Sequence, residues 1–216
     1  NLYKQTQMQD TFGMNMVALI EGQPRLLNLR EMLDAFLRHR REVVTRRTVY
    51  DLRKARERGH ILEGLAVALA NVDEIVDLIK SSETPVVAKE RLLGRAWKSA
   101  MVEEMLARID PEFSRPVNIG PEFGLHADGY HLSEIQAQRI LEMQLQRLTN
   151  LESDKIIGEY KEIMAKIADL LDILANPARI TQIIRDELGQ VQEQFGDARR
   201  SAIVENAQDM SMEDLI

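Results

Sequence analysis

The chain has 216 residues, of which 44% are hydrophobic but only 5% aromatic, and its formal net charge is -7. This composition, poor in glycine, can bury a core and favours helix over sheet. The absence of cysteine excludes disulfides and thiolate metal sites. An acidic net charge is unusual for a protein that binds nucleic acid.

Targeting signals are not evident in the sequence. No run of about 18 apolar residues predicts a membrane span. The first residues lack the basic-then-apolar layout of a signal peptide, and there is no initiator Met. We therefore expect a cytoplasmic protein and a fragment of a longer chain.

Residues 1–29 are predicted to form a base segment that contains a β-hairpin. Met16–Ile20 is a short apolar run, Glu21–Pro24 predicts a turn, and Arg25–Leu29 is the predicted second strand. Because two strands alone are marginally stable, we expect this hairpin to pack on protein outside the chain.

Residues 30–81 are predicted to form one long outgoing helix. No proline interrupts them, glycine occurs only at Gly59 and Gly64, and apolar residues recur at alternating steps of three and four, the seam of a coiled coil. A helix of about fifty residues spans about 75 Å and needs a partner to be stable.

The partner is predicted over residues 151–198, where apolar residues repeat with the same spacing on both sides of Asn176–Pro177. The two helices should fold back antiparallel as a coiled-coil hairpin. Residues 199–216 then return to the base, with a predicted strand at Ala202–Val204 and a short helix capped by Ser211.

The connecting residues 82–150 are too long for a simple loop and predict a small helical domain, the tip. Pro85 can open a helix, and Ala96–Ile109 is a second helical candidate. Prolines and glycines between residues 111 and 129 predict a loop-rich middle. Ser133 and Gln136 form a capping box for an apolar helix that extends to Leu148.

Several collinear stretches resemble the A subunits of bacterial type IIA topoisomerases, in particular DNA gyrase. They are Leu2–Gln9, Phe12–Leu19, Arg38–Thr48, His60–Leu65, Gln136–Leu141 and Glu193–Asp197. The insert at residues 82–130 is more similar to gyrase than to topoisomerase IV. The resemblance covers the whole chain and places it in the C-terminal part of the breakage-reunion region, where the family has a coiled-coil arm and an exit gate.

The resemblance implies that the whole enzyme cuts one duplex through a tyrosyl phosphate, passes a second duplex through the break with ATP, and negatively supercoils DNA. It also implies a homodimer and a gyrase B subunit that supplies the ATP and magnesium sites. The family's nucleophilic tyrosine lies between arginine and threonine. No tyrosine here is preceded by arginine, so we assign no catalytic residue and no cofactor to this chain and expect it to be inactive alone.

The basic stretch has two interpretations. Residues 30–60 carry ten Lys and Arg against five Asp and Glu, a net charge of +5, so the remainder of the chain carries -12. Arg46 and Arg47 are candidates for a DNA contact. If residue 80 pairs with residue 151, however, the antiparallel register places Arg38, Arg40, Arg41 and Arg47 beside Asp186, Glu187 and Glu193. We favour this internal ion pairing.

The histidines do not predict a metal site. His126 and His131 lie in one loop near Asp128, but such a group is more often solvated than metal-bound. His39 and His60 lie on the long helix, where packing is the better interpretation. We assign no metal ligand.

Asn176–Pro177 interrupts the return helix, with Asn176 as a cap and Pro177 in the first turn. The register places Pro177 opposite Lys54, close to Gly59, in a charged stretch without an apolar seam. We therefore expect a hinge at Lys54, Gly59, Asn176 and Pro177, with a static kink as the alternative.

The apolar helix of the tip presents more than one apolar face. One face can pack on the tip's own core and another on a second copy about a two-fold axis. Our candidates for this dimer interface are Arg139, Leu141, Met143 and Leu145, and the alternative is that these residues complete the core of their own chain.

The sequence thus predicts a mainly α protein whose role is mechanical, as the exit-gate and dimerisation arm of a gyrase A subunit. One alternative is the A subunit of topoisomerase IV. Another is a non-enzymatic coiled-coil dimerisation protein, because such arms share the same heptads. The hairpin at residues 14–29 favours a piece of a larger assembly over a free-standing arm.

Overall fold

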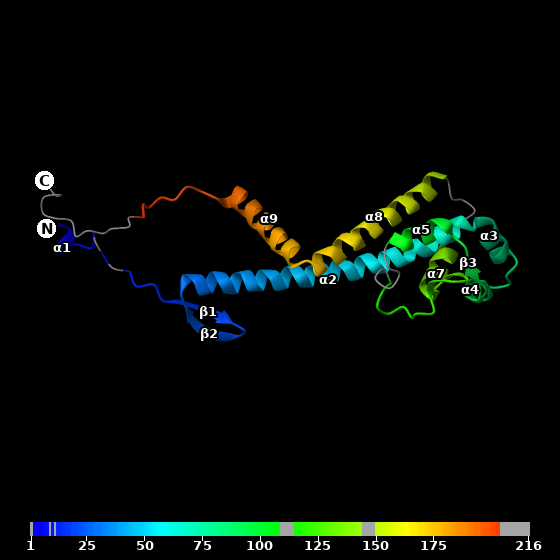
Figure 1. The fold of residues 1–216 in the computed structure, drawn as a ribbon, viewed down its shortest axis with the longest axis horizontal. Coiled ribbons are helices and arrows are strands. Elements are labelled where there is room, and N and C mark those ends of the chain that lie inside the picture. The colour runs from blue at the N-terminus through cyan, green and yellow to red at the C-terminus, as the bar shows by residue number, and fades with distance from the viewer. Residues whose placement is uncertain (1, 9, 11, 109–114, 144–149, 204–216) are drawn as a thin grey trace.

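The computed structural model describes residues 2–8, 10, 12–108, 115–143 and 150–203. These residues form an elongated, mainly helical molecule with two small antiparallel sheets (Figure 1). A globular tip lies at one end, and a β-hairpin lies near the opposite end, which we call the base. Among the described residues, no helix is both long and apolar enough to cross a membrane.

The predicted hairpin at the base is confirmed. After a short helix α1 (Leu2–Gln5), strands β1 (Met16–Ile20) and β2 (Gln23–Leu27) pair antiparallel, with Met16 opposite Leu27. The turn is Glu21–Gly22, and both residues have positive φ, 53° and 78°, as a two-residue hairpin turn requires. The second strand therefore begins two residues earlier than predicted.

The outgoing helix α2 (Leu29–Ala70) is 42 residues long. The Asn28 side chain accepts a hydrogen bond from the Glu31 amide, and the Glu31 carboxylate accepts one from the Asn28 amide, so a capping box begins the helix. The prediction of one helix over residues 30–81 was wrong at Asn71. The Asn71 side-chain amide donates to the carbonyl oxygens of Val67 and Lys98, and a separate helix α3 (Val72–Lys80) follows.

The return segment comprises α8 (Asn150–Ala175) and α9 (Pro177–Phe195). α8 runs antiparallel to the second half of α2, and buried residues of both helices, among them Leu62 and Ile167, belong to one hydrophobic cluster. α8 and α9 together form a shallow V whose vertex lies against the middle of α2 (Figure 1).

The tip comprises α3, α4 (Pro85–Leu93), α5 (Ala100–Arg108), α7 (Glu134–Glu142) and a three-stranded sheet. Strands β3 (Ala96–Trp97) and β4 (Gly124–His126) flank the central strand β5 (Gly129–His131). The sequence did not predict this sheet. The helix predicted to begin at Ala96 begins at Ala100, because Ala96–Trp97 pairs with β5.

Two further predicted elements end differently. α7 ends at Glu142, and the rest of the helix predicted to reach Leu148 lies outside the described residues. Ala202 and Ile203 are not in a strand, while Val204 and Ser211 lie outside the described part of the chain.

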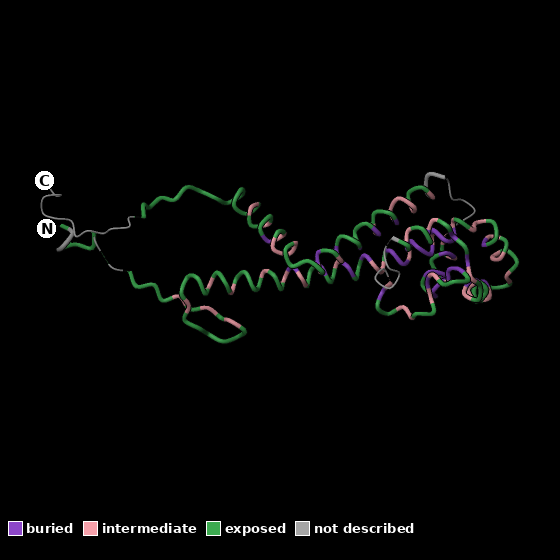
Figure 2. The backbone as a smooth tube through the Cα atoms, viewed as in Figure 1, coloured by how far each residue is buried: buried purple, intermediate pink, exposed green. Residues whose placement is uncertain are grey.

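Burial is concentrated in the tip and at the vertex of the V, whereas the base end is mostly exposed (Figure 2). The largest fully buried side chains include Trp97, Tyr130 and Tyr160 of the tip and of α8 beside it. The tip thus has a well-packed core, and α2 connects it to the base.

Candidate functional site

A buried polar network joins α2 to α7 at the centre of the tip. Ser133 caps α7 by accepting from the Gln136 amide, and the Gln136 side chain accepts from the Ser133 amide, so the predicted capping box is confirmed. His60 Nε2 lies 2.7 Å from Ser133 Oγ. The Gln136 side-chain nitrogen donates to the His60 carbonyl oxygen at 2.6 Å and to the Tyr130 hydroxyl at 2.8 Å.

Besides Tyr130, whose pKa burial raises well above its usual range, two titratable groups of this network have shifted pKa values. Burial raises the pKa of the Glu63 carboxyl to about 7, although a hydrogen bond from Tyr130 and the charge of Arg115 oppose the rise. Burial, with a smaller contribution from Arg115, lowers the pKa of His60 to about 4. Both groups therefore favour their neutral forms in the folded tip, as buried groups do.

Gly64 allows this network to approach α2. A Cβ built at Gly64 would lie 2.6 Å from Cγ and 2.7 Å from Cβ of Gln136. Any side chain at this position would displace Gln136 from the hydrogen bonds that it makes with His60 and Tyr130. The glycine that the sequence shows inside a helical pattern therefore serves close packing.

Three of the four predicted dimer-interface residues lie towards the C-terminal end of α7, at Arg139, Leu141 and the cap residue Met143. Leu141 and Met143 are half-buried and pack against the tip core, and Arg139 pairs with Glu142 at 2.8 Å. Leu145 lies outside the described residues. Leu141 and Met143 therefore share their surface with the core of their own chain.

Sequence reasoning missed the apolar residues that are exposed on this side of the tip. Val86 of α4 is 65% exposed and Ile135 of α7 is 49% exposed. Val86 and Leu141 line one groove between α4 and α7 together with Pro85, Lys89, Gln138 and Glu142. The sequence predicted that Val86 and Ile135 lie in helices, but it did not predict that these two helices, α4 and α7, pack against each other.

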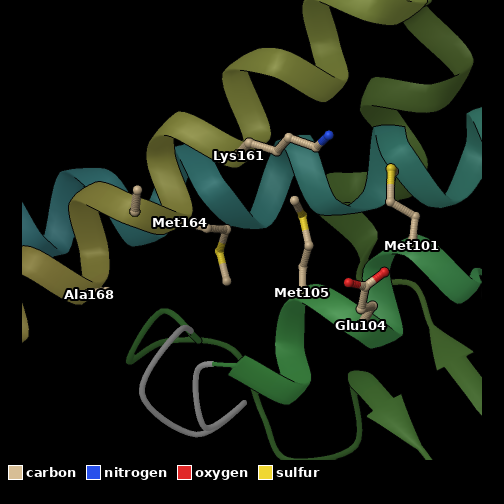
Figure 3. Close-up of a pocket in the computed structure, with 7 residues that line it drawn as sticks. Met101, Glu104, Met105, Lys161, Met164 and Ala168 are labelled. Carbon is tan, nitrogen blue, oxygen red and sulfur yellow. The ribbon is translucent and has the colours of Figure 1, made fainter.

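A second pocket lies between α5 and α8, with a volume of about 530 Å³ (Figure 3). Its lining is rich in methionine and carries one acidic and one basic side chain: Met101, Glu104, Met105, Lys161, Met164, Ala165 and Ala168. Met164 is buried and contributes to the core. The pocket therefore lies where α5 of the tip meets α8, and it borders the core.

The break in the return helix has the predicted cap. The Asn176 side chain accepts from the Ala178 amide at 3.1 Å, and Pro177 occupies the first turn of α9. Arg179 of α9 reaches back across the break and donates to both Asp169 and Asp172 of α8, with a distance of 2.8 Å to Asp169. Cap, proline and double ion pair together set the angle of the V.

On the outgoing side of the predicted hinge, α2 is continuous through Lys54 and Gly59. Lys54 pairs with Glu57 on the exposed surface at 2.8 Å. A Cβ at Gly59 would lie 3.2 Å from Ile163 and 3.4 Å from Ile167, so this glycine allows α8 to pack closely. Of the four predicted hinge residues, only Asn176 and Pro177 interrupt a helix.

Ion pairing accounts for part of the basic stretch. Arg40 and Arg47 both bind Glu187 of α9, and the Arg47 pair is 2.6 Å long. Arg58 binds Glu159 through two hydrogen bonds of 2.7 Å. Arg46 instead pairs with Glu42 on its own helix, and 78% of its side chain is exposed. The two candidates for a DNA contact thus differ, because Arg47 is engaged across the helices and Arg46 is not.

The two histidines predicted to lie in a loop instead end strands β4 and β5, and they contact each other. The rings of His126 and His131 pack edge to face with centroids 5.0 Å apart, and His131 Nε2 lies 3.0 Å from Asp128. The described residues contain no group of three or more His, Cys, Asp or Glu side chains placed to hold a metal ion.

Comparison with known proteins gives a consistent result along the whole chain. The model of the DNA gyrase/topoisomerase IV family of A subunits matches residues 1–189. The DNA gyrase A subunit of Pseudomonas aeruginosa is 57% identical over 216 residues, covering 100% of this chain and 23% of that protein. The Neisseria gonorrhoeae protein is 56% identical over 217 residues (100% and 24%), and the Escherichia coli protein 53% over 216 residues (100% and 25%). The chain thus spans about a quarter of the length of these relatives.

Proposed function

The chain belongs to the DNA gyrase/topoisomerase IV family of A subunits, and we propose that it forms the exit-gate and dimerisation arm of a DNA gyrase A subunit. In this proposal α2 and the pair α8–α9 form an antiparallel coiled-coil arm. The tip joins a second copy, and the base attaches the arm to the rest of the protein. The role of this part of the enzyme is mechanical.

The observation that carries the proposal is the division of the chain into a packed tip and an open base at opposite ends of one 42-residue helix. A helix transmits displacement along its length, about 1.5 Å per residue, so α2 can couple the tip to whatever the base contacts. Exposed apolar residues such as Leu19 and Leu26 of the hairpin, 74% and 68% exposed, favour attachment of the base to further protein.

Dimerisation is proposed to use the outer side of the tip. The groove between α4 and α7 contains Leu141, and Val86 and Ile135 lie on the same two helices. Met143 follows directly at the end of α7, with Arg139 one turn before it. About a two-fold axis this patch would meet its own copy. The predicted contact of Leu145 belongs to the same proposal.

Bending of the arm is proposed to occur where the return helix is broken. Asn176 and Pro177 divide α8 from α9, while α2 passes Lys54 and Gly59 without a break. A hinge at this level would therefore flex α2 elastically and rotate α9 about Pro177. Arg46, exposed on the neighbouring surface of α2, is the remaining candidate for a DNA contact.

The reaction belongs to the whole enzyme in this proposal. The chain's parent protein would act with gyrase B, which would supply ATP and magnesium, to pass one DNA duplex through another. The three relatives from Pseudomonas, Neisseria and Escherichia are all gyrase proteins, which favours gyrase over topoisomerase IV.

Sedimentation of the chain tests the gate. We expect a dimer of twice 24.7 kDa that Ile135→Asp converts to a monomer, because the substitution buries a charge from each copy in a self-complementary apolar patch. Ile135 is half exposed, so the substitution leaves the tip folded, which circular dichroism verifies. Leu19→Asp in the hairpin is the matched control and should leave the dimer intact. A dimer that survives Ile135→Asp and Val86→Asp would contradict the proposed surface, and a monomer at all concentrations would contradict the gate.

A further inference from the structure

A small cavity lies in the tip where α2 meets β4, β5 and residues 115–123, which we call the connection. The cavity offers about 10 Å³ to the centre of a water molecule, and one bound water needs about that much. Its lining combines polar with apolar side chains: His60, Glu63, Leu106, Arg115, Phe123, Gly124, Leu125 and Tyr130. The proposed gate makes no use of this cavity.

Glu63 supplies a carboxyl group to the cavity. The residue is 6% exposed, and its carboxyl accepts a hydrogen bond from the Tyr130 hydroxyl. The Tyr130 hydroxyl in turn accepts a hydrogen bond of 2.8 Å from the Gln136 side chain. The two oxygens of a carboxylate can accept about four hydrogen bonds, so the Tyr130 hydroxyl uses only part of the capacity of Glu63.

Arg115 brings a positive charge to the same cavity. A Cβ built at Gly124 would lie 3.4 Å from Arg115 Nη2 and 3.9 Å from Nε, so the guanidinium lies against the backbone of Gly124. Burial raises the pKa of Glu63, and the charge of Arg115 opposes that rise. The guanidinium therefore acts on the carboxyl group with which it shares the cavity.

A second buried hydroxyl lies near Glu63. Tyr160 of α8 is 0% exposed, and its hydroxyl has no hydrogen-bond partner within the described part of the chain. Burial raises the pKa of this hydroxyl and the charge of Glu63 raises it further, so the two groups are close. Because the Arg115 guanidinium alone carries five N–H groups, the donors around Glu63 outnumber the acceptor sites of its carboxyl.

A water molecule corrects this imbalance, since it accepts hydrogen bonds as well as donating them. Buried waters make about three hydrogen bonds to polar groups that the protein leaves unsatisfied. We propose that the cavity binds one water molecule, which accepts a hydrogen bond from the Arg115 guanidinium and donates one to the Glu63 carboxyl. This bridge fastens the connection to α2. It lies inside a single tip, so it does not depend on the proposed dimer.

Water–amide NOE spectra of the perdeuterated, ¹⁵N-labelled chain test the bound water. Gly124 and Leu125 line the cavity, so their amide protons should show NOEs of the sign that marks a long-lived water. Leu92 of α4 is also buried, at 0% exposure, but does not line the cavity. Its amide is the control and should show no NOE. The absence of NOEs at both Gly124 and Leu125 would overturn the bound water.

The variant Arg115→Met tests the bridge, because methionine is long and unbranched but has no N–H donor. The NOEs at Gly124 and Leu125 should disappear in this variant. Exchange of the Tyr130 hydroxyl with solvent would instead give NOEs that survive the substitution, and surviving NOEs would overturn the proposal. Circular dichroism verifies that the variant is folded, and the spectrum of the native chain decides whether the water is present independently of it.

Amide hydrogen exchange tests whether the bridge fastens the connection. The amides of Ile119 and Phe123 donate to carbonyl oxygens within the connection, so their exchange reports its opening. Arg115→Met should speed this exchange about tenfold, as expected for the loss of a hydrogen bond to a charged group. Arg95→Met, at an exposed arginine elsewhere on the tip, is the matched control and should leave the rates unchanged.

Equal exchange rates in Arg115→Met and Arg95→Met would overturn the fastening of the connection. Faster exchange in Arg115→Met, combined with no water NOE in the native chain, would mean that Arg115 pairs directly with Glu63. That result would overturn the bound water. Sedimentation reports the tip dimer separately, so failure of the bridge and failure of the gate are distinguishable.

Discussion

Leu62 and Leu33 belong to one continuous helix, yet Leu62 is 1% exposed in the tip and Leu33 is 54% exposed at the base. The residue type is the same at both positions. The difference arises from what is opposite them: α2 meets α7 and α8 near Leu62, whereas α9 diverges from α2 near Leu33. Periodicity assigns a face to a helix, but only a neighbouring element buries it.

The largest expected effect comes from comparing the substitutions Leu62→Ala and Leu33→Ala. Leu62→Ala leaves a cavity in a closed core and should lower the free energy of unfolding by about 2–5 kcal/mol. Leu33→Ala at an exposed position should change it by less than about 0.5 kcal/mol. Urea denaturation followed by circular dichroism measures both. Comparable losses would show that the base half of α2 is as tightly packed in solution as the tip.

Glu63→Gln sharpens the comparison through pH. Because the folded-state pKa of Glu63 is raised to about 7, its neutral form stabilises the fold below pH 4.5, and this contribution is lost as pH rises through 7. Its full size is roughly 3 kcal/mol. The Glu63→Gln variant does not lose this contribution. At pH 8 its free energy of unfolding should therefore exceed that of the native protein by roughly 3 kcal/mol.

The low-pH side of the same profile belongs to His60, whose pKa is lowered to about 4. Its contribution to stability is present above pH 6.5 and is lost as pH falls through 4, opposite in sign to that of Glu63. Without the Glu63 contribution, the free energy of unfolding of the Glu63→Gln variant should rise from pH 4 to 6.5 and then stay level. Glu57→Gln, on the exposed surface of α2, is the control and should keep the native profile above pH 4.5. A Glu63→Gln profile that rises no more steeply than the native one between pH 4.5 and 6.5 would mean that Glu63 is not buried as described.

Gly64→Ala and Gly158→Ala compare a crowded with an open helical glycine. The methyl group at Gly64 would meet the Gln136 side chain at 2.6 Å, and overpacking of this kind costs about 1–3 kcal/mol. At Gly158 no atom lies within 4 Å of the new Cβ, so alanine should stabilise the helix by about 0.5–1 kcal/mol. Thermal melts measure both, and stabilisation by both substitutions would argue against the network around Gln136.

The smallest effects are expected at two capping boxes of the same type. Ser133→Ala removes a buried cap and the partner of His60 Nε2, and should cost about 1–2 kcal/mol. Asn28→Ala removes an exposed cap at the base and should cost about 0.5–1 kcal/mol. Hydrogen exchange of the first turns of α7 and α2 measures the cost of each substitution. Equal costs would show that burial does not make the cap of α7 more important than that of α2.

Local signals in the sequence predicted the ends of several elements. The hairpin at residues 16–27, the start of α4 at Pro85, the cap of α7 at Ser133 and the break at Asn176–Pro177 each depend on turn or cap chemistry within a few residues. Such interactions are complete within one segment, so they can be recognised without knowing the fold.

The three-stranded sheet of the tip and the end of α2 at Asn71 could not be predicted in this way. β3 is two residues long and pairs with a strand more than thirty positions away. Asn71 ends α2 partly through the carbonyl of Lys98 in the tip. The polar network could not be predicted for the same reason. In the sequence His60 and Glu63 are typical helix residues, and they are buried only because α7 and β5 pack against them.

The sequence by itself determined the mainly helical class, the break in the return helix and the family, because periodicity, caps and collinear motifs are carried by neighbouring residues. Only the tertiary structure decided which apolar positions are buried, where the glycines of α2 allow close packing, and that Arg179 spans the break. Burial and close packing require two segments to meet, and neither can be read from residues that are neighbours in the chain.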